Sequence, residues 1–323
     1  MTPRLRQAWI LLGLGTLLAG CGGNQNTVAP ASHPERSVAD VFWVMLGVSC
    51  VGFGVIVTLL FLGWARRDRP SLPGGGGERA ATRVVIGLGV ALPIVLLVSL
   101  FIWSDLFVLR SVAAPTGRTP MTVRVIGHQW WWEVRYPGAG VVTANEIHIP
   151  VETKVTALVT TDDVIHSFWV PELNRKVDMI PGVTNRLLLV ADKPGVYRGQ
   201  CAEFCGLQHA HMSVEVIAEP RPMFDAWLAR NAKPAPRTNA LFTRNCSGCH
   251  QIRGTSAKAD VGPDLTHFAS RRSIAALTLP NTPANLRDWL RDPQHVKPGN
   301  RMPDLPLKQP QWVALQRYLE SLR

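Results

Sequence analysis

Residues 201–212 read Cys201-Ala-Glu-Phe-Cys205-Gly-Leu-Gln-His209-Ala-His-Met212 and follow a stretch of β-type composition. They put two thiols, an imidazole and a thioether on one loop. A second imidazole, His166, stands in Asp163-Val-Ile-His166-Ser-Phe-Trp169, far away in sequence but within reach across a β-sandwich. Zinc sites use cysteine and histidine, but a thioether is a poor zinc ligand and a familiar axial ligand of electron-transfer copper. The loop therefore favours copper over zinc.

The number of ligands indicates how many metal ions the loop holds. Two thiolates can bridge two metal ions, which leaves one imidazole for each ion. The Met212 sulfur and a backbone carbonyl can complete the two sites as weak ligands. A rigid, dry pair that shares an unpaired electron suits electron relay better than substrate binding.

The sequence on both sides of the loop predicts an all-β domain. Short runs rich in Val, Ile and Thr are separated by Gly, Pro and Asn at close intervals, which is typical of a β-sandwich or barrel. The predicted domain spans residues 117–222. Its clearest strands are 122–126, 146–149, 155–160, 186–190 and 213–217.

The C-terminal part carries a haem-attachment sequence. After a predicted linker, 231–237, residues 238–323 read as an all-α domain, with helices at 239–245, 282–292 and 310–322. Within it stands Cys246-Ser-Gly-Cys249-His250, in which both thiols form thioethers to haem and the histidine binds the iron. This pentapeptide predicts a covalent haem c.

The sixth iron ligand is predicted to be Met302, the only methionine after His250. It stands in Gly299-Asn-Arg-Met302-Pro, which looks like the distal loop of small cytochromes c. Ligation by His and Met raises the reduction potential, as suits an electron carrier early in a downhill chain. His267 and His295 remain rival ligands.

The N-terminal part predicts export and membrane anchoring. Residues 1–20 have the pattern of a secretory signal, and Leu18-Ala19-Gly20-Cys21 resembles a bacterial lipobox, which implies cleavage and lipidation at Cys21; an uncleaved signal anchor is the alternative. A tether, 21–40, precedes two nearly uncharged runs, 41–65 and 84–109, each long enough to cross a bilayer. The loop 66–83 holds five arginines and is placed in the cytoplasm by the positive-inside rule.

Charge excludes one class of function. The chain has 323 residues and a formal net charge of +11, of which +7 belongs to residues 234–323. No run of Lys and Arg with interleaved aromatic residues is present, so we do not expect nucleic-acid binding.

The hairpin and the β-type domain, over about 30–222, closely resemble the CuA domain of subunit II of cytochrome c oxidase. The resemblance rests on the helical hairpin, Gly127-His-Gln-Trp-Trp-Trp-Glu133, the His166 motif and the cysteine loop. It implies a cupredoxin-like fold and a place for electrons to arrive at Trp130. It also implies a magnesium ion shared with subunit I through the Glu203 carboxylate. The implied copper ligands are His166, Cys201, the carbonyl of Glu203, Cys205, His209 and Met212.

The joined copper and haem domains resemble subunit II of the caa-type oxidases. That resemblance implies electron transfer from cytochrome c or another donor to haem c, then to CuA, then to subunit I, which reduces oxygen and pumps protons. Subunits I and III are the implied partners, in the bacterial inner membrane with both soluble domains on the periplasmic side. The alternatives are the CuA subunit of a nitric oxide reductase and a membrane-tethered copper-delivery protein.

Overall fold

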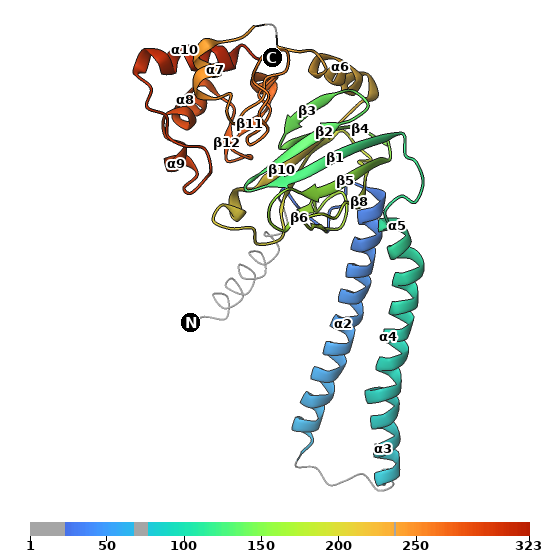
Figure 1. The fold of residues 1–323 in the computed structure, drawn as a ribbon. Helices are drawn as coiled ribbons and strands as arrows, with labels where there is room; N and C mark the ends of the chain where they lie inside the picture. The colour runs from blue at the N-terminus through green and yellow to red at the C-terminus, as the bar shows by residue number, and fades with distance from the viewer. Residues whose placement is uncertain (1–22, 68–76, 236) are drawn as a thin grey trace, which may run out of the picture. The chain divides into compact units, whose positions relative to one another are not determined.

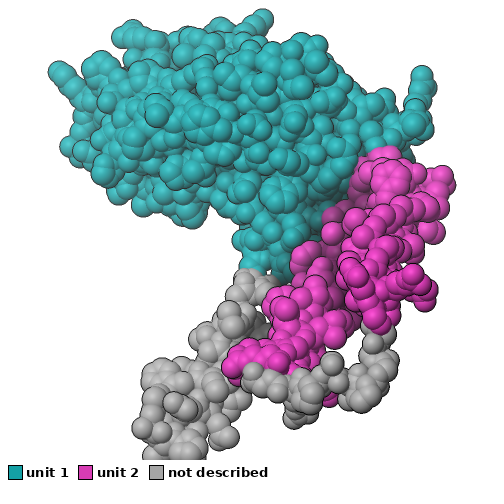
Figure 2. Space-filling model, turned by 90° about the horizontal axis from the view of Figure 1, so that it is seen from below, with its two compact units in different colours: residues 1–35, 114–323 teal, residues 36–113 magenta. Residues whose placement is uncertain are grey.

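The computed structural model describes residues 23–67, 77–235 and 237–323. These residues divide into two compact units, coloured separately in Figure 2. One unit is the helical segment Arg36–Ala113, and the other joins Ala114–Arg323 to the segment that ends at Glu35. The predicted signal peptide, the lipidation site Cys21 and residues 68–76 of the predicted cytoplasmic loop lie outside the described residues.

The helical unit holds two long apolar helices (Figure 1). The first is α2 (His33–Ala65). The second runs without a break from Glu78 to Val112 through α3 (Glu78–Ile86), η1 (Gly87–Ala91), α4 (Leu92–Trp103), η2 (Ser104–Leu109) and α5 (Arg110–Val112). Their 33 and 35 residues exceed the roughly 20 that a bilayer requires, and their apolar side chains are exposed. Both helices begin earlier than the predicted apolar runs 41–65 and 84–109, because each includes more polar residues at its start.

Two five-stranded sheets form the sandwich (Figure 1). The first has the order β3-β2-β1-β5-β8 and the second the order β4-β10-β9-β6-β7. β1 pairs in parallel with β5, and β4 with β10, while the other pairs are antiparallel. The strands are β1 (Met121–His128), β2 (Trp131–Tyr136), β3 (Val141–Ala144), β4 (Glu146–Pro150), β5 (Val155–Thr161), β6 (His166–Trp169), β7 (Val177–Met179), β8 (Asn185–Leu189), β9 (Gly195–Cys201) and β10 (Ser213–Glu219).

The core of the sandwich lies between the sheets. Alternating strand residues point inward and are fully buried, as Val123 and Val125 are on β1 and Ile147 and Ile149 on β4. The prediction of an all-β, cupredoxin-like domain is therefore confirmed. Its five predicted strands coincide with β1, β4, β5, β8 and β10 to within one or two residues.

One helix that follows the sandwich was not predicted from the sequence. Helix α6 (Arg221–Asn231) packs on the sandwich through Trp227, whose ring stacks on buried His148 with 3.9 Å between centroids. The predicted linker begins at Asn231, which is the last residue of this helix.

The C-terminal domain is mainly helical, as predicted. Asn239 caps α7, accepting bonds from the N–H groups of Leu241 and Phe242, and Thr282 caps α8 through Asn285 N–H. The domain closes around Phe242 and other buried apolar side chains. Its elements are α7 (Ala240–Asn245), η4 (Phe268–Ser270), β11 (Ser273–Ile274), β12 (Leu279–Pro280), α8 (Pro283–Arg291), α9 (Pro293–Val296) and α10 (Gln309–Glu320).

Candidate copper and haem sites

His166 is held in place by the strands around it. It begins β6, and its side chain is fully buried. Strand β1 of the other sheet has Gly127 against the ring, where a Cβ atom would lie 2.8 Å from His166 Cδ2. The ring Nε2 lies 2.9 Å from Asp163 Oδ1. With Nε2–H donated to this carboxylate, Nδ1 keeps its lone pair free for a metal ion.

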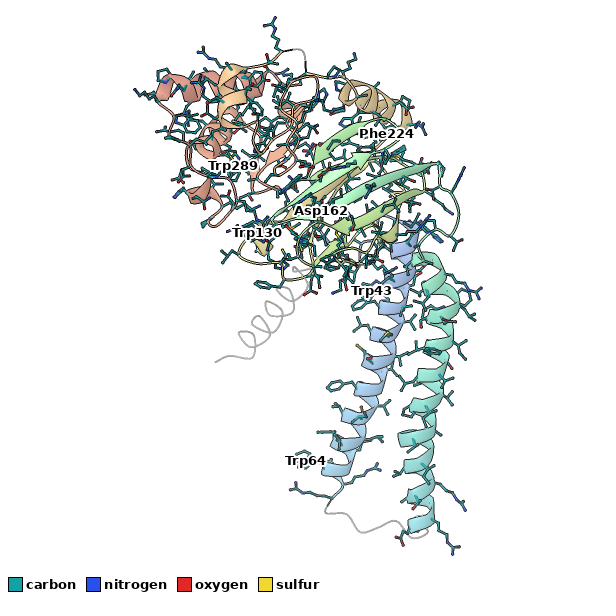
Figure 3. The ribbon with its side chains drawn as sticks, in the orientation of Figure 1. Trp43, Trp64, Trp130, Asp162, Phe224 and Trp289 are labelled. Atoms are coloured by element: carbon teal, nitrogen blue, oxygen red, sulfur yellow. The ribbon has the colours of Figure 1, made fainter. Side chains whose placement is uncertain are left out.

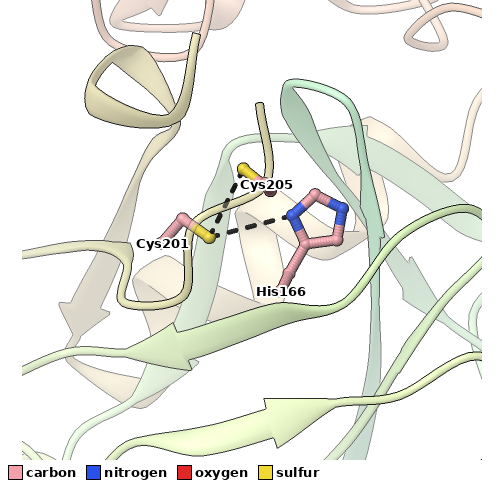
Figure 4. A group of neighbouring side chains, drawn as sticks. All are labelled: His166, Cys201 and Cys205. Atoms are coloured by element: carbon pink, nitrogen blue, oxygen red, sulfur yellow. Dashed lines mark hydrogen bonds between the residues drawn. The ribbon is translucent and has the colours of Figure 1, made fainter. Parts of the chain in front are cut away.

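The two thiols of the loop meet this free nitrogen (Figure 4). Cys201 Sγ lies 3.7 Å from His166 Nδ1 and 3.8 Å from Cys205 Sγ. Cys201 is the last residue of β9, and both thiols are buried. Two sulfurs that each lie roughly 2.3 Å from one metal ion in a tetrahedral arrangement are roughly 3.7 Å apart. The observed sulfur separation therefore fits two thiolates that share metal ions.

The remaining predicted ligands surround the thiols. His209 Nδ1 lies 3.6 Å from Cys205 Sγ, and Met212 Sδ lies 3.8 Å from the same sulfur. The Glu203 carbonyl oxygen lies 3.1 Å from Cys201 Sγ. Each thiol therefore has one imidazole and one weaker donor beside it, which is the donor set that two equivalent copper ions need.

Proximity makes the two thiols titrate unequally. The hydrogen bond from Cys205, together with His166, lowers the pKa of Cys201. The pKa of Cys205 is raised, chiefly because its thiol is bonded to Cys201 and because it is buried. Metal cations bind thiolates, so metal binding must displace the protons that these thiols carry.

Trp130 lies between the copper ligands and the C-terminal domain. Its indole Nε1–H donates to the Cys205 carbonyl at 3.1 Å, and Gln129 Nε2 donates to the same carbonyl at 2.7 Å. Trp130 and Trp289, both labelled in Figure 3, line one cavity from the two domains. The indole thus joins the copper loop to that cavity.

The lining of the cavity is that of a haem site, because Cys246, Cys249 and His250 line it together with Met302. The His250 Nδ1 atom lies 2.8 Å from the Pro263 carbonyl oxygen, so Nε2 is free to bind iron. Burial lowers the pKa of His250 and favours the neutral imidazole that a metal requires.

The rival iron ligands lie elsewhere. His267 and His295 are not among the residues that line the cavity. His267 is buried, with Nε2 at 2.9 Å from the Lys233 carbonyl oxygen, and His295 is exposed. This arrangement favours Met302.

Three positions that support the copper ligands were not singled out from the sequence. Asp163 binds His166, Gly127 leaves room for its ring, and Gln129 binds the copper loop. The spacing Asp163-x-x-His166 was a usable signal, because metal-binding histidines commonly pair with a carboxylate. The other two depend on contacts between parts far apart in the sequence, which the local sequence does not reveal.

Comparison with known proteins found matches for both folded domains. Residues 140–219 match the family described as cytochrome c oxidase subunit II, periplasmic domain, and residues 236–323 match cytochrome c. Cytochrome c oxidase subunit 2 of Alkalihalophilus pseudofirmus is 35% identical over 333 residues, covering 96% of this chain and 95% of that protein. The protein of the same name from Bacillus sp. (strain PS3) is 36% identical, with 72% of each chain covered.

Solved structures match a smaller part of the chain. The periplasmic domain of subunit II of cytochrome oxidase from Bradyrhizobium japonicum is 29% identical, with a TM-score of 0.35, covering 36% of this chain and 96% of its own. A haem-copper terminal oxidase dimer solved by electron cryomicroscopy contains a chain with 26% identity and a TM-score of 0.33, covering 41% of this chain.

Proposed function

The chain belongs to the cytochrome c oxidase subunit II family, and we propose that it receives electrons for a haem-copper terminal oxidase through a haem and a dinuclear copper centre of its own. One observation carries the proposal. Six predicted copper-binding groups, from β6, β9 and the loop after β9, converge with contacts of 3.1 to 3.8 Å around two buried thiols.

The proposed path has three transfers of one electron each. His250 and Met302 would hold the haem, which would take one electron at a time from a donor. Cys201 and Cys205 would hold the copper pair together with the other four predicted groups, and that pair would relay each electron from the haem to subunit I. There, four electrons and four protons would convert oxygen to two water molecules. Trp130 supplies aromatic contact between the haem cavity and the Cys205 carbonyl.

Burial of the ligands argues against copper delivery. His166 and Met212 are fully buried, and Cys201 and Cys205 are 3% and 4% exposed. A delivery protein must surrender its metal to a partner, which requires accessible sulfur ligands. The relatives are named as cytochrome c oxidase subunits, which favours oxygen reduction over nitric oxide reduction.

The helical unit supports a place in the bacterial inner membrane. We propose that the two long helices cross the membrane beside subunit I and that both soluble domains lie on its periplasmic side. Cytochrome c is the proposed donor and subunit III a further partner. The Glu203 side chain is exposed on the copper loop, where it is available to a magnesium ion shared with subunit I.

The test is spectroscopy of the purified oxidase. We expect a c-type haem absorption band, oxygen consumption with a reduced donor, and a copper hyperfine pattern from one electron shared by two copper nuclei. A hyperfine pattern from a single copper nucleus would exclude the dinuclear centre. Nitric oxide reduction without oxygen reduction would exclude the oxidase.

A further inference from the structure

Two loops of the haem domain lie against the copper end of the sandwich. We define the copper end as residues 129–132 and 201–212. The first loop is 275–277, and the second is 297–302, which also carries Met302. The segment that supplies the predicted iron ligand is thus the segment that touches the copper domain.

Lys297 is the buried centre of this contact. It is 3% exposed, and its Nζ donates to the carbonyls of Trp130 at 2.9 Å, His211 at 2.8 Å and Ala275 at 3.3 Å. An ammonium group has three N–H donors, and burying it is costly unless all of them are paired. Two of its three acceptors belong to the copper end, so the haem domain alone does not satisfy this lysine.

The loop 275–277 depends on the same contact. Ala275, Ala276 and Leu277 have φ values of 54°, 57° and 65°, a left-handed run that is unfavourable for residues other than glycine. Ala276 is 2% exposed because it packs against Trp131 of the copper end, and its carbonyl accepts from Ser213 N–H at 3.4 Å. Contacts across the junction compensate for the strained backbone.

Further contacts surround Lys297. Gln208 Nε2 donates to the Pro298 carbonyl, and Arg301 donates to Gln129 Oε1. At Gly299 a Cβ atom would lie 2.9 Å from Leu207 Cδ1, so the backbone of the second loop rests on a side chain of the copper loop.

We propose that Lys297 is a positioning residue that locks the haem domain onto the copper end, so that the electron passes from haem to copper in one fixed arrangement. The inference rests on the proposed function and adds to it. In the step concerned, ferrous haem becomes ferric and the mixed-valence copper pair gains that one electron. The lock also covers Trp130, which is 9% exposed, so an external donor delivers its electrons to the haem domain.

The test is the rate of electron transfer from haem to copper in the purified oxidase. A flash-activated reductant reduces the haem. The absorbances of the haem and copper bands, recorded against time, then give the rate at which the electron moves from haem to copper. In Lys297→Met we expect a rate lower by about tenfold or more, because the hydrogen bonds from the Lys297 amine to the Trp130 and His211 carbonyls across the junction are lost. The haem spectrum and the copper hyperfine pattern should stay as in the wild type. Lys308→Met, at an exposed lysine of the same domain, should transfer at the wild-type rate.

Two kinds of failure are distinguishable. Absence of the haem or copper signal in the wild type overturns the proposed function. Normal signals with equal rates in wild type, Lys297→Met and Lys308→Met overturn the positioning role.

A cross-link provides a second test, which reports the contact between the two loops directly and not only through an electron-transfer rate. A Cβ atom at Gly299 would lie 3.7 Å from Leu207 Cβ, within the range of roughly 3.5 to 4.5 Å that a disulfide requires. The φ of 78° at Gly299 strains a cysteine there, and the variants with and without Lys297 share that strain, so it cancels in their comparison. We expect Leu207→Cys/Gly299→Cys to cross-link when diamide oxidises it, and more slowly when Lys297→Met is added. The cross-link should restore fast transfer to that triple variant. Equal cross-linking with and without Lys297, or no restoration, would overturn the proposal.

Discussion

Replacing Asp163 with asparagine should weaken the copper site without removing any metal ligand. The Asp163 carboxylate accepts from His166 Nε2–H at 2.9 Å and from the backbone N–H of Gln129 at 2.7 Å, using both oxygens. An asparagine keeps one oxygen and turns an amide N–H₂ group toward one of these two donors. Either the His166 Nε2–H group or the Gln129 backbone N–H group then loses its acceptor.

The size of the effect can be worked out from this geometry. Burial raises the pKa of Asp163, but the hydrogen bonds from His166 and from two backbone N–H groups lower it by a larger amount. The net result is a pKa of about 2, below the ordinary value of 3.8. That drop corresponds to roughly 2 kcal/mol, and because the side chain is 18% exposed we expect about 1–2 kcal/mol. Loss of a carboxylate behind a metal-binding histidine typically costs roughly 10- to 100-fold in metal affinity. We expect Asp163→Asn to fall in that range.

A competition titration of copper against a chelator measures the affinity. The control is Asp162→Asn, which changes an exposed carboxylate one residue away. We expect the control to bind copper like the wild type, and Asp163→Asn to bind it more weakly with altered hyperfine coupling. Equal affinities for the two variants would refute the role given to Asp163.

The remaining predictions concern the glycine beside His166, the sixth iron ligand and proton release. Gly127→Ala should displace the buried His166 ring and lower the copper affinity. Gly138→Ala, whose added Cβ would have nothing within 4 Å, should leave the affinity unchanged. Copper titration of both variants checks this. Met302→Leu should keep the covalent haem but lower its reduction potential, measured by spectroelectrochemistry, while His267→Leu should leave the potential unchanged. Copper binding to the thiol pair should release protons and tighten as pH rises, because copper binds thiolates and the pKa of the Cys205 thiol is raised. Calorimetry in buffers of different ionisation enthalpy would reveal the released protons, and an affinity independent of pH would contradict this account.

The pH dependence of stability follows from Asp163. Its pKa is lower in the folded than in the unfolded protein, so its contribution to stability is present above pH 3.8 and is lost as the pH falls through about 2. In the metal-free protein, we expect wild type to be more stable than Asp163→Asn at pH 5 by about 1–2 kcal/mol. The difference should disappear near pH 2, as measured by denaturant unfolding.

The sequence singled out the candidate copper ligands because most of them cluster. Five of the six groups lie within twelve residues, and only His166 had to be brought from elsewhere. Their convergence depends on β6 pairing with β9 in one sheet, where Phe168 lies opposite Cys201. The resemblance to a known family implied that the six groups meet, but no strand pairing was predicted.

The supporting contacts were harder to predict because they depend on tertiary structure. Lys297 looks in the sequence like any basic residue of a basic domain, and only the structure places its amine among three carbonyls. Helix α6 was missed although Pro222 stands in its first turn, where proline favours a helix start. The stacking of Trp227 on His148, which stabilises this helix, is a tertiary contact that the sequence does not show.

The central claim is that electrons reach copper through the haem of the same chain, and rapid mixing of the purified oxidase with a reduced donor tests it most directly. We expect the haem band to appear first and the copper band to change afterwards at the rate at which the haem is reoxidised. A haem-free variant, Cys246→Ala/Cys249→Ala, should then accept electrons from that donor only slowly. Reduction of copper before haem, or at an undiminished rate in the haem-free variant, would contradict the account.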